Sequence, residues 1–149
     1  MTKKNDAQIN FALTAIKTEQ FAIFEENFEQ KNESGFSTEL QFKLNHINKQ
    51  IGVFLGFEFF QNEKIFLKIQ VSCNFKIQEQ SWDNFIHENK SDIVIPKNFM
   101  AHLAMITTGT ARGVLFAKTE STCFSKFIVP TINVSDMILE DVVFNIKDE

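Results

Sequence analysis

The sequence predicts an α+β fold: a four-stranded antiparallel sheet, then one long helix, an extended connector and a short C-terminal helix. Two patterns carry this prediction. Apolar and polar residues alternate along 65–78, which is typical of a strand with one buried and one polar face. Residues 95–118 instead hold apolar residues three and four positions apart, which is the spacing of one helix face.

Four alternating runs predict the strands of the sheet. Residues 9–24 alternate with a change of phase near Ile16, which suggests a bulge or a bend. Residues 36–48 and 51–60 alternate again on either side of a short polar break, and 65–78 form the cleanest run. Because the connections between the last three runs are short, we expect an antiparallel meander.

A polar loop over 79–94 precedes the helix, which we expect to begin at Pro96 and to end near Lys118. The helix is apolar on two opposite faces. One face carries Phe99, Leu103, Ile106, Thr110 and Gly113, and the other carries Ala101, Ala104, Thr108, Ala111 and Leu115. A chain of this length has one core, so we expect one face to pack on that core and the other on a second copy of the helix. We assign this oligomer interface to Ala101, Ala104, Thr108 and Ala111.

The segment after the helix divides into two expected parts. Residues 124–134 are apolar but contain Pro130, which predicts an extended connector rather than a central strand. Ser135 is the expected N-cap of a short amphipathic C-terminal helix. We expect residues 1–8 to be disordered and residues 9–149 to form a single domain.

Composition excludes several classes of protein. The 149 residues carry a net charge of −4, with no long basic run, which argues against a general nucleic-acid binder. No charge-free apolar segment reaches the roughly 18–20 residues that a membrane span needs. The N-terminal segment lacks the apolar stretch of a signal peptide. Cys73 and Cys123 are too few and too distant for a disulfide framework or a zinc cluster, so we expect reduced thiols in a cytoplasmic protein.

Residues that commonly carry catalysis are present but isolated. His46, His87 and His102 have no partner at a metal-binding or catalytic spacing. The segment 107–113 resembles a phosphate cradle but lies within the expected helix and lacks the phosphate-binding lysine. Glu58 lies between phenylalanines on a strand, where a solvated position is more common than a catalytic one. We therefore expect no enzyme activity, no cofactor and no metal.

The apolar surface is the remaining candidate site. Phe54, Phe60 and Phe66 alternate onto the sheet face opposite the regular apolar one, and Met137 and Ile138 of the last helix are expected to form a facing wall. Such a groove binds extended polypeptides or lipid chains. Coverage of the same rings by the chain itself is the alternative.

The order of elements and three segments resemble the SecB export chaperone family, in a diverged branch. Residues 11–25 resemble the family's first strand, 106–113 the end of its long helix, and 127–138 the proline-containing connector before its last helix. The resemblance implies an ATP-independent holdase that binds non-native polypeptides, for protein export or for protection of an antitoxin-like client. It also implies a homotetramer, built as a dimer of dimers with the long helices at the interface, and possible docking on the translocase motor.

Two other functions stay open. A lipid or small-molecule carrier would use the phenylalanine-rich sheet face as its pocket. A hot-dog-type thioesterase would use Glu58 or His102 as the acid or base. Suppression of client aggregation separates the chaperone hypothesis from both.

Overall fold

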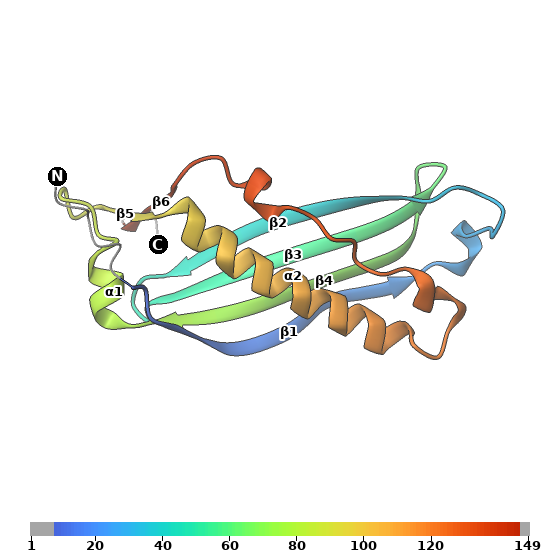
Figure 1. The fold of residues 1–149 in the computed structure, drawn as a ribbon, viewed down its shortest axis with the longest axis horizontal. Coiled ribbons are helices and arrows are strands. Elements are labelled where there is room, and N and C mark those ends of the chain that lie inside the picture. The colour runs from blue at the N-terminus through green and yellow to red at the C-terminus, as the bar shows by residue number, and fades with distance from the viewer. Residues whose placement is uncertain (1–7, 147–149) are drawn as a thin grey trace.

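A four-stranded antiparallel sheet carries one long helix on one of its faces, as the sequence predicts (Figure 1). The computed structural model describes residues 8–146, so most of the expected disordered segment 1–8 lies outside the described residues. The strands are β1 (Phe11–Ile23), β2 (Gly35–Asn45), β3 (Gln50–Gln61) and β4 (Lys64–Ile77), and the helix is α2 (Lys97–Thr119). The fold class is therefore α+β.

The strand order is β1-β4-β3-β2, which corrects part of the predicted meander. Strands β2, β3 and β4 follow one another as expected, but β1 pairs with β4 at the opposite edge from β2. Residues 24–34, including a 3₁₀ turn η1 (Glu25–Asn27), carry the chain from one edge to the other. The buried side chain of Gln61 holds this crossover: it accepts a hydrogen bond from the Glu29 N–H (2.8 Å) and donates to the Glu29 carbonyl (3.0 Å).

The central strands present their large apolar side chains to the helix. Cross-strand partners lie on the same face of an antiparallel sheet, and Val53 faces Cys73, while Phe57 faces Ile69. All four side chains are fully buried. In β1, two register shifts flank Ile16, which confirms the irregularity predicted from the change of phase.

Helix α2 begins directly after Pro96, but the face that packs on the sheet is the one we assigned to a second copy. Ala101, Ala104, Thr108, Ala111 and Leu115 are all buried within the single chain. The predicted interface of Ala101, Ala104, Thr108 and Ala111 is therefore wrong. The physical reason is size: small side chains let the helix backbone approach a sheet surface that large aliphatic and aromatic side chains already fill. The Thr108 hydroxyl donates to the Ala104 carbonyl (2.8 Å), which satisfies it in this apolar layer.

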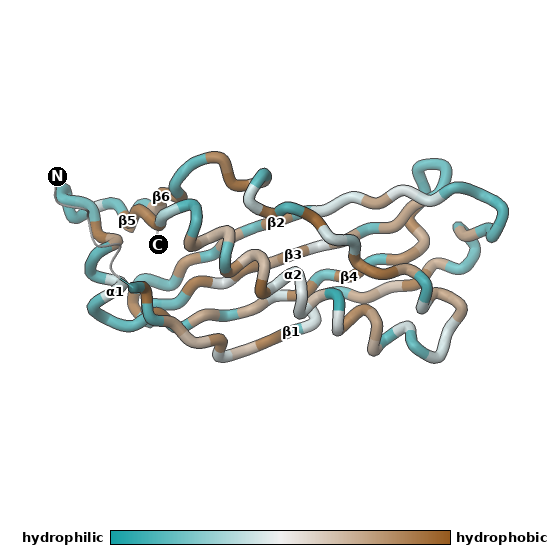
Figure 2. Tube along the Cα trace, in the orientation of Figure 1, coloured by the Kyte–Doolittle hydropathy of each residue, from teal (hydrophilic) through white to brown (hydrophobic). Residues whose placement is uncertain are grey.

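The expected C-terminal helix is replaced by a turn and a strand. Residues 127–133 of the connector are extended as predicted, whereas its first residues, 124–126, form part of a 3₁₀ turn. Figure 2 shows hydrophobic residues along the connector. A 3₁₀ turn η3 (Val134–Met137) follows, capped by Asn133, whose side-chain oxygen accepts from the Ser135 N–H (3.2 Å). Strand β6 (Val142–Asn145) then pairs antiparallel with β5 (Asp92–Ile95). Its β-branched residues suit a strand, and the pairing with β5 overrides the helical periodicity of the segment.

Two short elements complete the fold. Helix α1 (Glu79–Asp83) lies where the loop before α2 leaves β4, and a 3₁₀ turn η2 (Cys123–Lys126) follows α2. Apolar side chains fill two core clusters between the sheet and α2, one around Trp82 and Met100 and the other around Phe66 and Leu115.

Candidate functional site

The five side chains predicted to bind clients do not form one groove. Phe54 and Phe60 are half-buried on the outer face of the sheet, which is the face away from α2. Phe66 and Ile138 belong to the core on the helix side, and only Met137 is exposed there. The sheet therefore separates the expected walls of the groove.

Phe66 is buried because β3 and β4 shift register at its position. Phe59 pairs with Leu67 and Phe60 pairs with Ile65, so Phe66 has no partner of its own. The extra residue interrupts the alternation of side chains, and both Phe66 and Leu67 turn toward the core. The Phe66 ring contacts Phe28 and Phe127, with 4.9 Å between ring centroids in each pair.

Phe54 and Phe60 pack over glycines, and Phe54 also borders two depressions of the outer face, of about 200 and 210 Å³. A Cβ atom on Gly35 would lie 2.7 Å from the Phe60 ring, and one on Gly52 would lie 3.2 Å from the Phe54 ring. The Lys43 ammonium lies 4.7 Å from the centroid of the Phe54 ring. Around them, the outer face carries four lysines and three glutamates: Lys17, Lys43, Lys68, Lys76, Glu19, Glu39 and Glu58. This face is polar and of mixed charge, so it does not suit an apolar client or a lipid chain.

Glu58 and His102 do not share a site. Glu58 forms an ion pair with Lys68 (3.5 Å) beside a depression of about 200 Å³ on the outer face. His102 lies on α2, across the sheet, with its ring against Phe11 of β1 (5.8 Å between centroids). The two groups therefore cannot act as an acid and base on one substrate. Among residues 8–146, no group of three or more His, Cys, Asp or Glu side chains is placed to hold a metal ion.

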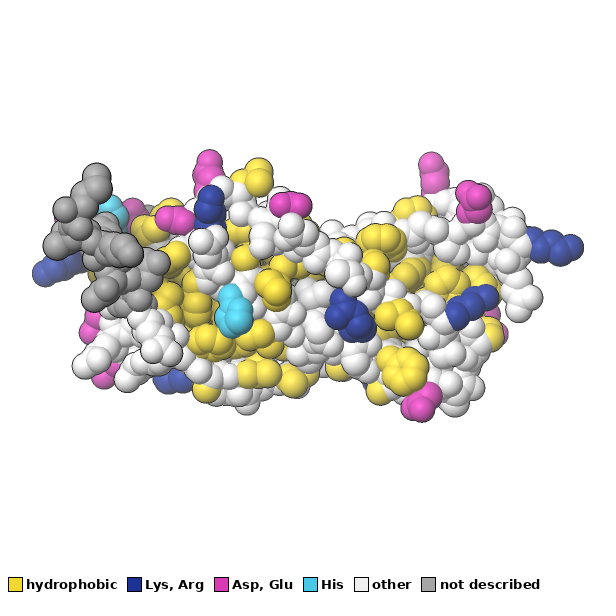
Figure 3. All heavy atoms as spheres, in the orientation of Figure 1, with side chains coloured by type: hydrophobic (Ala, Val, Ile, Leu, Met, Phe, Trp, Pro, Cys, Tyr) yellow, Lys and Arg dark blue, Asp and Glu magenta, His cyan; other side chains and the backbone are white. Residues whose placement is uncertain are grey.

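The part of the chain that the structure describes has two exposed apolar surfaces, and the first includes the part of β1 that α2 does not cover. Leu13 and Ile16 point to the helix side, because their cross-strand partners Phe75 and Cys73 do, yet both remain exposed. Met105 and Phe116 are exposed on the solvent-facing side of α2, and Figure 3 shows apolar side chains on this helix-bearing face of the molecule. We call these four residues the β1 flank of α2.

Glycines on α2 leave its exposed side open beside the β1 flank. A Cβ atom added at Gly109 or Gly113 would meet no atom within 4 Å. With Met105 and Phe116, these glycines follow one another at helical spacings of four, four and three, so they line one side of the helix. The helical periodicity alone could not show which side of α2 would stay exposed.

The second exposed apolar surface follows the connector, on the other flank of α2. Figure 1 shows the connector running back beside the helix toward β6. Val129 and Val134 point inward and are buried, whereas Ile128, Met137 and Leu139 are exposed. We call these three exposed residues the connector flank. Sequence analysis found only Met137, because the expected helix assigned the wrong periodicity to this segment.

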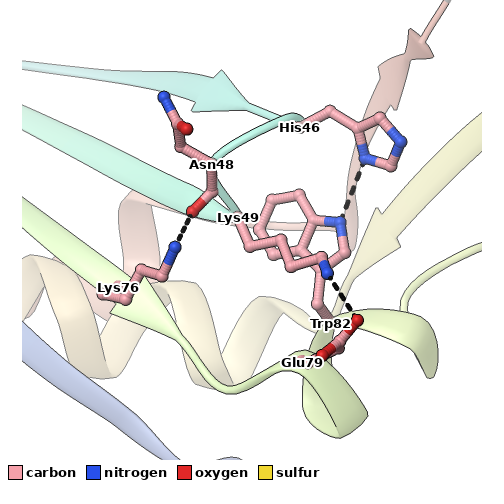
Figure 4. Close-up of polar contacts among 6 residues, drawn as sticks. All are labelled: His46, Asn48, Lys49, Lys76, Glu79 and Trp82. Carbon is pink, nitrogen blue, oxygen red and sulfur yellow. Dashed lines mark hydrogen bonds and ion pairs between the residues drawn. The ribbon is translucent and has the colours of Figure 1, made fainter.

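A polar cluster at one end of the sheet is structural (Figure 4). The indole N–H of buried Trp82 donates to Nδ1 of His46 (3.0 Å), and the rings of these residues stack. Lys49 forms an ion pair with Glu79 (3.0 Å), and the Lys76 ammonium donates to the Asn48 carbonyl. These contacts fix α1 and β4 to the turn between β2 and β3. His46 therefore acts here as a hydrogen-bond acceptor in packing.

Comparisons with protein-family models, curated proteins and solved structures find no match to this chain. The resemblance to SecB-like chaperones therefore stays a prediction from the sequence. Within the described part of the chain, no helix is both long and apolar enough to cross a bilayer.

Proposed function

We propose that this protein is an ATP-independent holdase that binds non-native polypeptides in the cytoplasm and works as a homo-oligomer. The observation that supports this proposal is the exposure of large apolar side chains on both flanks of α2, although the core between α2 and the sheet is well filled. Exposed apolar patches of this kind mark interaction sites. The two flanks lie on different kinds of element, which suits them to two different tasks.

The β1 flank suits a second copy of the chain. Its residues lie on a regular helix and an adjoining strand, which present a fixed shape to a partner. The open glycines Gly109 and Gly113 allow the backbone of a second helix to approach closely. The proposed assembly therefore keeps the expected role of α2 but moves the interface to Leu13, Ile16, Met105 and Phe116.

The connector flank suits clients of varied sequence. Its residues lie on an extended segment and a short turn, and Met137 has a flexible side chain that adapts to different partners. Burying one large apolar side chain contributes about 1.5–3 kcal/mol, so a few weak contacts would hold an unfolded chain reversibly. Exported chains and antitoxin-like chains both present unfolded apolar segments, and the proposal covers either class of client.

The test is suppression of aggregation. A chemically unfolded client enzyme is diluted into buffer without nucleotide, with and without an equimolar amount of the protein, and light scattering is followed. We expect the unmodified protein to suppress scattering and the double variant Ile128→Ser, Leu139→Ser to lose most of this effect.

The matched control is Ile47→Ser, because Ile47 is an isoleucine that is 85 % exposed in the turn between β2 and β3, away from both flanks. This variant should suppress aggregation as well as the unmodified protein. A folded double variant that still suppresses fully would remove the connector flank from the client site. Failure of the unmodified protein to suppress aggregation would refute the holdase proposal.

A further inference from the structure

Strand β2 presents a long free edge. It pairs with β3 along Gly35–Asn45 without any register shift, whereas the other edge strand, β1, contains two shifts. In the described part of the chain, the backbone groups of residues 36–44 form no hydrogen bonds other than those with β3. A regular unpaired edge is a template for another strand unless something blocks it.

The charges along this edge complement each other under a two-fold rotation. Glu39 and Lys43 are exposed on the outer face, each two residues from Gln41. If β2 pairs antiparallel with β2 of a second copy around Gln41, each Glu39 lies opposite the Lys43 of the other copy. On the inner face, each half-buried Leu40 then lies opposite the Phe42 of the other copy. Opposite charges and apolar pairs directly across a ladder both stabilise it.

Other registers are less favourable. Centring the pair on Glu39 or on Lys43 sets two like charges directly opposite each other. Centring it on Leu40 or Phe42 keeps apolar side chains on one face but pairs neither Glu39 nor Lys43 with an opposite charge. A pairing centred between two residues would set inner-face residues opposite outer-face ones, for example Leu40 opposite Gln41, and would place the apolar side chains of one copy on the polar face of the other.

The geometry points to the β2 edge as a second self-association surface, at which two copies join their sheets through antiparallel β2 strands centred on Gln41. A dimer of dimers needs two different self-complementary surfaces, and the β1 flank offers one of them. The inference deepens the proposed function in this respect and rests on the assembly proposed there. Phe36, which is 46 % exposed at the start of β2, would then lie opposite His46 of the other copy and lose exposure.

Charge reversal tests the pairing. The mass of the protein is measured by light scattering at micromolar concentration for Glu39→Lys, Lys43→Glu and the variant with both changes. Because of the two-fold symmetry, each single change creates two pairs of like charges across the β2–β2 contact. We therefore expect the dissociation constant of this contact to rise at least tenfold and the measured mass to halve. The double change restores opposite charges and should restore the mass.

The controls are Glu33→Lys and Lys64→Glu, which make the same charge changes at exposed positions outside β2. Both should keep the mass of the unmodified protein. Circular dichroism confirms that each variant is folded, because Lys43 also contacts the Phe54 ring.

A cysteine at the two-fold axis tests the register. In a background with Cys73→Ser and Cys123→Ser, Gln41→Cys lies opposite itself, with Cβ atoms about 4.5–5.5 Å apart, within reach of a disulfide after a small adjustment. Mild oxidation should give a covalent dimer, whereas Ser37→Cys, which lies opposite Asn45, should give little.

The outcomes separate the two interfaces. If charge reversal leaves the mass unchanged while Met105→Glu lowers it, the β2 pairing is wrong and the assembly through the β1 flank stands. Equal crosslinking of the Gln41→Cys and Ser37→Cys variants would also overturn the β2 pairing. A monomeric unmodified protein would overturn both interfaces.

Discussion

Substitution by glutamate should destabilise the single chain at Ala104 but not at its neighbour in α2, Met105. Ala104 is fully buried against the sheet, whereas Met105 is 58 % exposed on the β1 flank. Glutamate at position 104 would place a carboxylate among apolar side chains without a partner. An unpaired buried charge costs about 3–5 kcal/mol, a large part of the roughly 5–15 kcal/mol that stabilises a typical domain. Glutamate at position 105 would face solvent in the single chain and change its stability by no more than about 0.5 kcal/mol.

Thermal unfolding followed by circular dichroism measures the difference. A destabilisation of 1 kcal/mol lowers the Tm of a chain of this size by about 2–4 °C, so Ala104→Glu should lower it by roughly 6–20 °C. Met105→Glu should change the unfolding temperature of the single chain by only a few degrees but reduce the mass measured by light scattering. A stable Ala104→Glu protein with a lowered mass would show that the small-residue face of α2 meets a second copy after all. That result would refute the packing described here.

Three further variants test separate features of the fold. Gln61→Leu removes the hydrogen bonds that hold the crossover and leaves backbone groups unpaired, so urea unfolding should show a loss of about 1–3 kcal/mol; an unchanged midpoint would mean that water replaces the side chain fully. Gly35→Ala would set a methyl group 2.7 Å from the far end of the half-buried Phe60 ring, which can move aside, so the same measurement should show a loss of no more than about 1 kcal/mol. The Cys73→Ser, Cys123→Ser double variant should stay folded and suppress client aggregation, with a loss of about 1 kcal/mol at the buried position. A folded double variant that binds no client would reveal thiol chemistry in the function.

The strands and the long helix could be predicted because their signals are local. Alternation and helical spacing are properties of neighbouring residues, and they indicated the right element type for β2, β3, β4 and α2, whereas β5 was missed within the expected loop 79–94. The partner of β1 could not be read in this way, because pairing with β4 depends on contacts between residues far apart in the chain. The same limit explains residues 142–145, whose helical periodicity is overridden by pairing with β5.

The candidate surfaces were harder to predict than the elements. The two predicted faces of α2 are equally apolar in sequence, and only packing decides that the second is buried throughout while the first is buried only at Phe99 and Leu103. At Phe66, a single extra residue in β4 reverses the expected direction of the side chain. The connector flank depends on a turn capped by Asn133, where the sequence suggested a helix that begins at Ser135.

Arg112 of α2 determines which side chains of the connector face solvent. Its guanidinium group donates to the carbonyls of Val129 (2.8 Å) and Pro130 (3.1 Å), two successive residues of the connector. Along an extended chain, successive side chains point in opposite directions. The two hydrogen bonds from Arg112 fix the rotation of the connector about its own axis. With that rotation fixed, Val129 enters the core and Ile128 faces solvent. One arginine on the helix thus orients the segment that the proposed clients would contact.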